Sequence, residues 1–272
     1  MTWWMQLDKE RGSRPRCVLM MDGNRELVAK RLTDLANIPA VTVSPEDRWM
    51  PRGKPVQKEN GEWDKEPANE AKLAEPNPIL PQNLSQQLKQ WWLAVLRNNP
   101  NTPNWDIAST CSVDGRQGLL LVEAKAHDVE LKGEEKGKPD SGNADNHERI
   151  RQCIEEANRG LWNDTRVDWN LSRDSHYQMS NRFAWAWKLT ELGVPTILVY
   201  LGFLNAEEMK RGRTQKPFAD HAEWEQLVKS RSQPLFPAEV WNQQWIVNGQ
   251  AFVPLIRSMK IPYDRATPES GV

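Results

Sequence analysis

The pattern of apolar and polar residues along the chain predicts helices and strands in mixed order, as in an α/β protein. Short apolar runs between turn residues indicate strands, and apolar positions three and four apart indicate helices. Strands are expected at 17–21, 41–43, 105–113, 116–127, 195–203, 245–247 and 250–253, and helices at about 27–35, 84–97, 147–160, 175–192 and 219–229. Residues 119–122 are all apolar, so this strand is expected to be covered on both faces, as in an α/β sandwich.

Proline content divides the chain. Residues 44–82 contain many of its 19 prolines and show no apolar period, so we expect a linker or a long excursion there. The βα-like unit before it has no glycine-rich phosphate motif, which favours a structural or dimerisation role over a nucleotide site. We therefore expect a βα-type extension with a proline-rich linker over 1–80, a main domain over 81–265 and a C-terminal tail over 266–272.

Composition excludes several classes of protein. With 36 basic and 37 acidic residues the formal net charge is −1, so this is not a strongly basic nucleic-acid-binding chain, although a local basic cleft is compatible with it. No apolar stretch approaches the length of a transmembrane helix, and the N-terminus does not resemble a secretory signal. Three widely spaced cysteines form neither a zinc pattern nor a disulfide framework, so a cytoplasmic location is expected.

The candidate chemistry comes from a β-hairpin. Asp114-Gly115 is a strong two-residue turn signal, and the register that it sets pairs Asp106 with Glu123. Carboxylates directly opposite each other repel, and the only counterion visible along these two strands is Lys125, on the same face as Glu123. A divalent cation would neutralise the pair, and carboxylate oxygens suit Mg²⁺, with Mn²⁺ as a substitute.

This arrangement resembles the PD-(D/E)xK motif of the restriction-endonuclease-like nuclease superfamily. The resemblance covers about residues 83–203 and is carried by Asp106 and by Glu123-Ala124-Lys125, with Trp105 in place of the motif's proline. It implies a small mixed β-sheet flanked by helices, with Mg²⁺ held by Asp106, Glu123 and the Ala124 carbonyl. It also implies that Lys125 assists catalysis and that the substrate is mostly DNA.

Other Glu-x-Lys triplets show how much the hairpin adds to the motif. The spacing occurs five times, at Glu70, Glu123, Glu130, Glu134 and Glu208, but only Glu123 ends an apolar strand with an acid in register. The expected function is therefore metal-dependent hydrolysis of DNA by an endonuclease, with RNA not excluded and a homodimer or a partner subunit possible. The alternatives are a nuclease-fold subunit that binds nucleic acid or protein without cleaving, and an ordinary interaction protein with a surface ion pair.

Accessory residues are expected in two further places. Gln178, Asn181 and Arg182 lie on the helix before the apolar strand at 195–203, where a polar residue can face the metal site; His127 follows Lys125 on the same face. The charged insertion at 128–146 leaves the strand at the rim of the site. Three of its lysines are candidates for DNA phosphates, although a solvated loop has the same composition: Lys132, Lys136 and Lys138.

Overall fold

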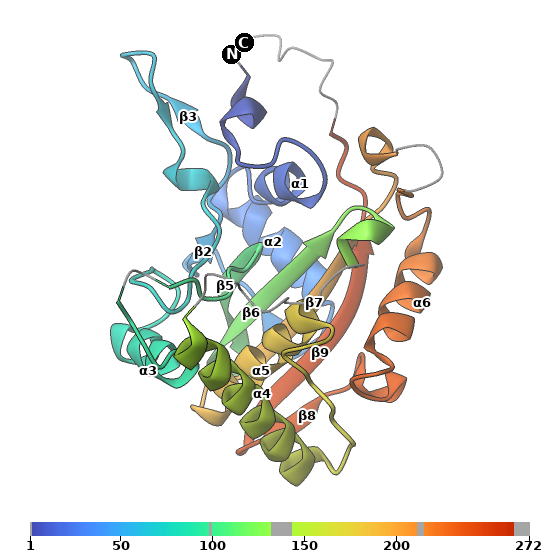
Figure 1. The fold of residues 1–272 in the computed structure, drawn as a ribbon. Helices are drawn as coiled ribbons and strands as arrows, with labels where there is room; N and C mark the ends of the chain where they lie inside the picture. Colours follow the sequence, from blue (N-terminus) through green and yellow to red (C-terminus); the bar gives the residue numbers. More distant parts are fainter. Residues whose placement is uncertain (1, 98–99, 132–142, 211–214, 264–272) are drawn as a thin grey trace.

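A curled mixed β-sheet runs through the molecule, with helices on both faces (Figure 1). The computed structural model describes residues 2–97, 100–131, 143–210 and 215–263. The sheet has the order β1-β5-β6-β7-β9-β8, and β2 also pairs with β5. Its strands are β1 (Val41–Thr42), β2 (Trp49–Met50), β5 (Ile107–Val113), β6 (Arg116–Lys125), β7 (Thr196–Phe203), β8 (Trp245–Val247) and β9 (Gln250–Met259). The β6–β7 and β7–β9 pairs are parallel and the others antiparallel, which confirms the expected mixed sheet flanked by helices.

Two apolar cores lie on opposite faces of the sheet. On one face α3, α4, α5 and α6 pack against residues such as Leu119 and Leu121. On the other face α1 and α2 pack against residues such as Leu120 and Val122, so β6 is covered on both sides as expected. The helices are α1 (Ser13–Met20), α2 (Arg25–Ala36), α3 (Gln82–Trp92), α4 (Ala144–Thr165), α5 (Tyr177–Glu191) and α6 (His221–Ser232). None of the helices in the described part of the chain is long and apolar enough to span a membrane.

The hairpin that carries the candidate chemistry has the expected turn and register. Asp114 and Gly115 both have positive φ, 50° and 75°, as a type I′ turn requires. Val113 pairs with Arg116, and the ladder continues to Ile107 opposite Val122. The second predicted hairpin is confirmed in the same way, by positive φ at Asn248 and Gly249 between β8 and β9.

The strand expected at 17–21 is wrong, because this segment belongs to α1. An apolar run of five residues does not distinguish a strand from one side of a buried helix. Here Cys17 and Met20 lie on the buried face, and Pro15 stands in the first turn, where a helix tolerates it.

The segment at 44–82 is richer in structure than its composition indicates. It contains β2, a separate hairpin of β3 (Val56–Gln57) and β4 (Trp63–Asp64), and a 3₁₀ helix at Glu66–Ala68. β1 and β2 both pair with β5, so residues 41–50 form part of the main sheet rather than a detached extension. In Figure 1 the hairpin of β3 extends from the body of the molecule.

Several element ends also differ from the sequence prediction. The helix expected at 84–97 begins at Gln82 after Pro81 and ends at Trp92. α4 is longer than expected at both ends, and its N-cap Asn143 accepts hydrogen bonds from the N–H groups of Asp145 and Asn146. These differences arise because caps and tertiary packing, not the apolar period, decide where an element stops. The predicted tail at 266–272 lies outside the described residues.

We expect Gly160→Ala to destabilise the protein, although alanine normally favours a helix by about 1 kcal/mol relative to glycine. A Cβ at position 160 of α4 would overlap the indole ring of Trp187 on α5, so the two helices would have to separate. Thermal unfolding should show a lower Tm. Asn163→Ala, at an exposed position of the same helix, should leave Tm unchanged or raise it; an equal or higher Tm for Gly160→Ala would contradict the close approach.

Candidate active site

The candidate site lies where β6 ends, on the face of the sheet that α5 covers. Asp106 comes directly before β5, one step beyond the last pair of the ladder, Ile107 and Val122, and so opposite Glu123. Its Oδ2 accepts a hydrogen bond from the backbone N–H of Ala124 at 2.7 Å. The predicted juxtaposition of the two acids is therefore present, with Asp106 partly buried and Glu123 fully buried.

Glu123 is held by two cations. The Lys125 Nζ lies 2.6 Å from its Oε1, and the Arg182 Nε lies 2.6 Å from its Oε2. Lys125 also donates to the side-chain oxygen of Gln178 at 2.7 Å. The structure thus brings Gln178 and Arg182, both proposed as accessory residues, into direct contact with the predicted motif.

The spacing of α5 explains this convergence. Gln178 and Arg182 are four residues apart and share one face of the helix, which turns toward β6. The Arg182 guanidinium also lies over the ring of Trp105, 4.9 Å from its centroid, and its Nη1 donates to the side-chain oxygen of Asn181 at 2.7 Å. This hydrogen bond links Asn181 to the site.

Charge and burial shift the pKa values of the two acids in opposite directions. Burial, and next the charge of Glu123, raise the pKa of Asp106 to about 7. Burial alone would also raise the pKa of Glu123, but Arg182 and Lys125 outweigh it and hold that pKa below its usual value. Burial would lower the pKa of Lys125, yet Glu123 and Asp106 keep it raised, so the ammonium stays charged.

Arg182 is a second counterion of Glu123, which the hairpin sequence alone does not reveal. Lys125 is the only counterion visible along the hairpin strands, but Arg182 on α5 supplies a second positive charge. Two carboxylates and two cations therefore balance formally without a bound metal. The positive charges are nevertheless distributed unevenly, because both cations contact Glu123. Among the described residues, Asp106 has no basic side chain within ion-pair distance.

The donor chemistry of the site fits Mg²⁺ or Mn²⁺ in part. Asp106, Glu123 and the Ala124 carbonyl offer oxygen atoms, and Mg²⁺ in proteins often uses one or two carboxylates and keeps several waters. Within the described ranges no three His, Cys, Asp or Glu side chains are grouped closely enough to hold a metal ion. Asp106, which lacks a basic partner there, is the side chain best placed to become a ligand.

The remaining predicted residues are not joined to this cluster by the contacts of the structure. His127 is buried at the end of β6, where its Nδ1 accepts from the N–H of Val129 and its backbone bridges to Pro217. It lines a separate hollow with Glu130 and Met209. Three predicted DNA contacts lie outside the described residues: Lys132, Lys136 and Lys138.

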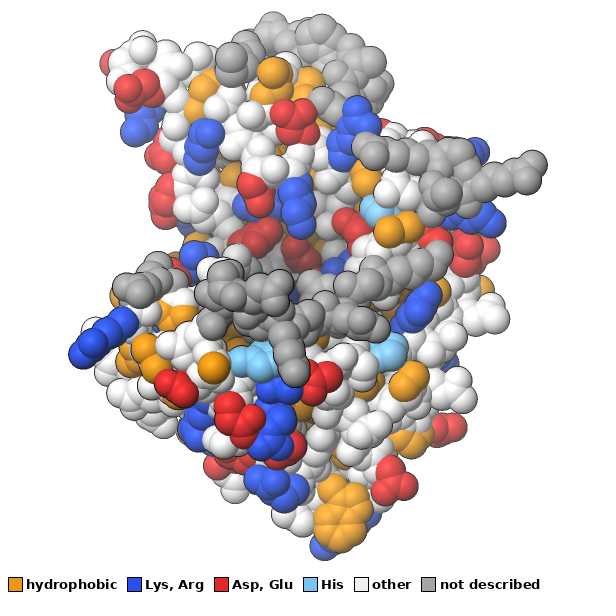
Figure 2. Space-filling model, viewed as in Figure 1, with side chains coloured by type: hydrophobic (Ala, Val, Ile, Leu, Met, Phe, Trp, Pro, Cys, Tyr) orange, Lys and Arg blue, Asp and Glu red, His pale blue; other side chains and the backbone are white. Residues whose placement is uncertain are grey.

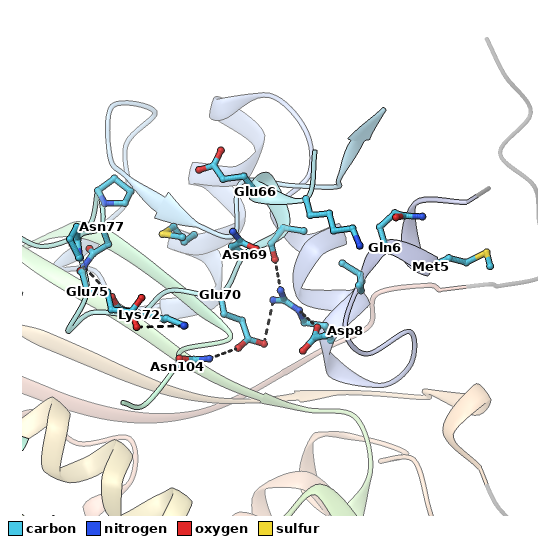
Figure 3. Close-up of a pocket in the computed structure, with 17 residues that line it drawn as sticks. Met5, Gln6, Asp8, Glu66, Asn69, Glu70, Lys72, Glu75, Asn77 and Asn104 are labelled. Atoms are coloured by element: carbon cyan, nitrogen blue, oxygen red, sulfur yellow. Dashed lines mark hydrogen bonds and ion pairs between the residues drawn. The ribbon is translucent and has the colours of Figure 1, made fainter. Parts of the chain in front are cut away.

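A polar pocket of about 720 Å³ adjoins the site and was not predicted from the sequence. Glu70 is one of its lining residues, and Figure 3 shows the Glu70 side chain directed toward Asn104. Asn104 Nδ2 donates to Glu70 at 3.3 Å, and the Arg14 Nη1 lies 3.4 Å from its carboxylate. Glu70 belongs to one of the Glu-x-Lys triplets, but nothing in its local sequence shows that it comes next to Trp105 and Asp106. On the face drawn in Figure 2, acidic and basic side chains gather in a hollow between the upper and lower parts of the molecule.

Comparisons with known proteins add no family to this description. No family model, no curated protein and no solved structure matches the chain. The chemistry of the site is therefore the basis for assigning a function.

We expect Arg182→Met to lower the free energy of unfolding by about 3–5 kcal/mol, because it leaves the buried carboxylate of Glu123 with one cation instead of two. Urea denaturation measures the loss. Lys229→Met is the matched control, since it breaks an ion pair with Glu225 on the surface of α6 and should cost less than about 1 kcal/mol. Similar small losses for both variants would show that Arg182 does not neutralise Glu123.

Proposed function

We propose that the protein is a metal-dependent nuclease that hydrolyses DNA phosphodiester bonds, as an endonuclease with a restriction-endonuclease-like core. The observation that carries the proposal is the convergence of Asp106, Glu123 and Lys125 on one face at the end of β6. Mg²⁺ or Mn²⁺ would be held by Asp106, Glu123 and the carbonyl of Ala124. A divalent ion in such a site acidifies water and withdraws charge from a phosphoryl oxygen.

The side chains of the chain have separate roles in this reaction. A water oxygen attacks phosphorus, one P–O ester bond breaks, and the products are a phosphomonoester end and a hydroxyl end. Lys125 keeps its proton and donates a hydrogen bond to the oxygen on which negative charge develops. Gln178 positions the Lys125 ammonium, and Arg182 positions Glu123.

A second candidate function is binding of nucleic acid or a protein partner without cleavage. The observation that favours it is the complete ion pairing of Glu123, whose two oxygens already contact Lys125 and Arg182. A cluster that is balanced in this way can persist as a structural element after catalysis is lost.

One experiment separates the two functions. The purified protein is incubated with supercoiled plasmid, linear DNA and RNA in Mg²⁺, in Mn²⁺ and in EDTA. Metal-dependent cleavage of DNA that disappears in Asp106→Asn supports the nuclease. Tight binding of DNA with no cleavage under any condition supports the second function, and cleavage retained in the variant points to a contaminating enzyme.

We expect Mg²⁺ or Mn²⁺ to raise the Tm of the wild-type protein, because a ligand that binds the native state stabilises it. Asp106→Asn should abolish most of this shift, since the carboxylate that lacks a basic partner becomes a neutral amide. Differential scanning fluorimetry over a metal titration measures both proteins. An equal shift in Asp106→Asn would reject the metal assignment.

We expect Lys125→Met to reduce cleavage by about 10²–10³-fold, the usual effect of losing a donor to developing charge, while the metal-induced Tm shift survives. Methionine keeps the length and the apolar part of the side chain. Lys210→Met provides the control, because Lys210 has the same Glu-x-Lys spacing in an exposed segment and should retain full activity. Full activity in Lys125→Met would exclude a catalytic role for the lysine.

A further inference from the structure

The pocket lined by Glu70 is tied to the strand that carries Asp106. Ala71 and Trp105 exchange two backbone hydrogen bonds, at 3.2 and 2.9 Å, so the segment that carries Glu70 runs beside the segment that leads into Asp106. Asn104, two residues before Asp106, lies in the pocket wall. The pocket wall therefore includes a residue two positions from Asp106 along the chain.

Arg14 fixes the acidic groups of this pocket. Its guanidinium is buried, donates to the carbonyl of Ala68, and lies 3.3 Å from Asp8 and 3.4 Å from Glu70. The Nη1 that faces Glu70 makes no hydrogen bond among the described residues. The Glu70 side chain is about one quarter exposed, so its carboxylate is held in place and still accessible (Figure 3).

The lining of the pocket restricts the chemistry of its occupant. Four acidic and three basic side chains surround it, and Lys72 is already paired with Glu75 at 3.5 Å. A phosphate is disfavoured by this excess of acids, and a simple cation is disfavoured by the fixed charge of Arg14. Amides such as Asn104 and apolar side chains such as Met50 complete the wall. The lining fits a neutral group that has both donors and acceptors and an apolar part.

We propose that this pocket receives one unpaired nucleobase of the nucleic-acid strand whose phosphate lies at Asp106. The proposal rests on the proposed function, because it is the substrate strand that brings a base to this position. Glu70 accepts from an amino or imino N–H of the base edge, as carboxylates do in base recognition. The volume of about 720 Å³ lies within the range of small-molecule sites and exceeds what one base needs. The substrate class is thus a single strand, or a duplex from which one base is extruded.

Binding in EDTA tests this inference without cleavage. The probes are a fluorescein-labelled single-stranded DNA oligonucleotide of mixed sequence and its abasic counterpart, which has the same phosphates and sugars. For the wild type, fluorescence anisotropy should give a lower Kd for the oligonucleotide with bases. Glu70→Gln should weaken that binding by about 10-fold to 100-fold, the range for a hydrogen bond to a charged group. Binding of the abasic probe should be unchanged or tighter, because the variant removes a negative charge.

Two further variants make the test specific. Asn69→Trp places a large ring in the pocket from an exposed position of its wall, so it should cause the same base-dependent loss without depending on Glu70. Glu62→Gln, on the exposed turn of the β3–β4 hairpin outside the pocket, should change neither Kd.

The outcomes separate this inference from the proposed function. Equal losses on both probes, no loss on either probe, or no binding of oligonucleotide at all would overturn the pocket assignment. Plasmid cleavage in Mg²⁺ together with base-independent binding would overturn it while the nuclease stands. Base-dependent binding that is lost in Glu70→Gln, without any plasmid cleavage, would support the pocket and reject the nuclease.

Discussion

The structure around the candidate site depends on one buried carboxylate, that of Glu123. A charge with almost no contact with solvent is very costly unless it is paired, and here each oxygen is paired with a different cation at 2.6 Å. One of these cations comes from the same strand and the other from α5. The interaction therefore joins β6 to α5. It also fixes the orientation of α5 about its own axis, because Gln178 and Arg182 must face the sheet. Apolar packing alone allows many rotations of a helix, whereas this pairing is satisfied in one.

The same pairing gives the two acids of the site different charge environments. Along the sequence the two opposed carboxylates of the hairpin are equivalent, but the folded chain places them in different surroundings. Glu123 is neutralised by its own protein, and Asp106 receives one backbone hydrogen bond and a carboxylate neighbour. Asp106 thereby becomes the place where an added positive charge would relieve the most repulsion. Part of the difference between the acids thus arises from α5, which supplies Arg182 and lies more than fifty residues further along the chain.

Local sequence signals predicted the hairpin and its register. They could not predict contacts between segments that are far apart in the sequence. The Asp114-Gly115 turn sets the register, and alternation then determines that Glu123 and Lys125 share a face, so the central part of the site follows from about twenty consecutive residues. The contact of Arg182 with Glu123 was anticipated only as one of three helix positions, because spacing indicates a face but not its partner. Glu70 and Arg14 were missed since their proximity depends on the backbone pairing of Ala71 with Trp105. The strand expected at 17–21 failed for a related reason: burial on one side of a short helix looks the same as a short strand.

The two short strands beside β5 have a consequence for association between molecules. An uncovered strand at the side of a sheet offers unpaired N–H and C=O groups that can template the addition of another chain. β1 pairs with Val113 and Ser112, β2 pairs with Ser109 and Ala108, and the N–H of Thr110 between them donates to the carbonyl of Arg48. Residues 41–50 therefore seal the outer side of β5 almost continuously. This early segment therefore protects the edge of β5 from pairing with other molecules. A truncated chain that starts after it would expose the backbone N–H and C=O groups of β5, and these could pair with another copy of the chain.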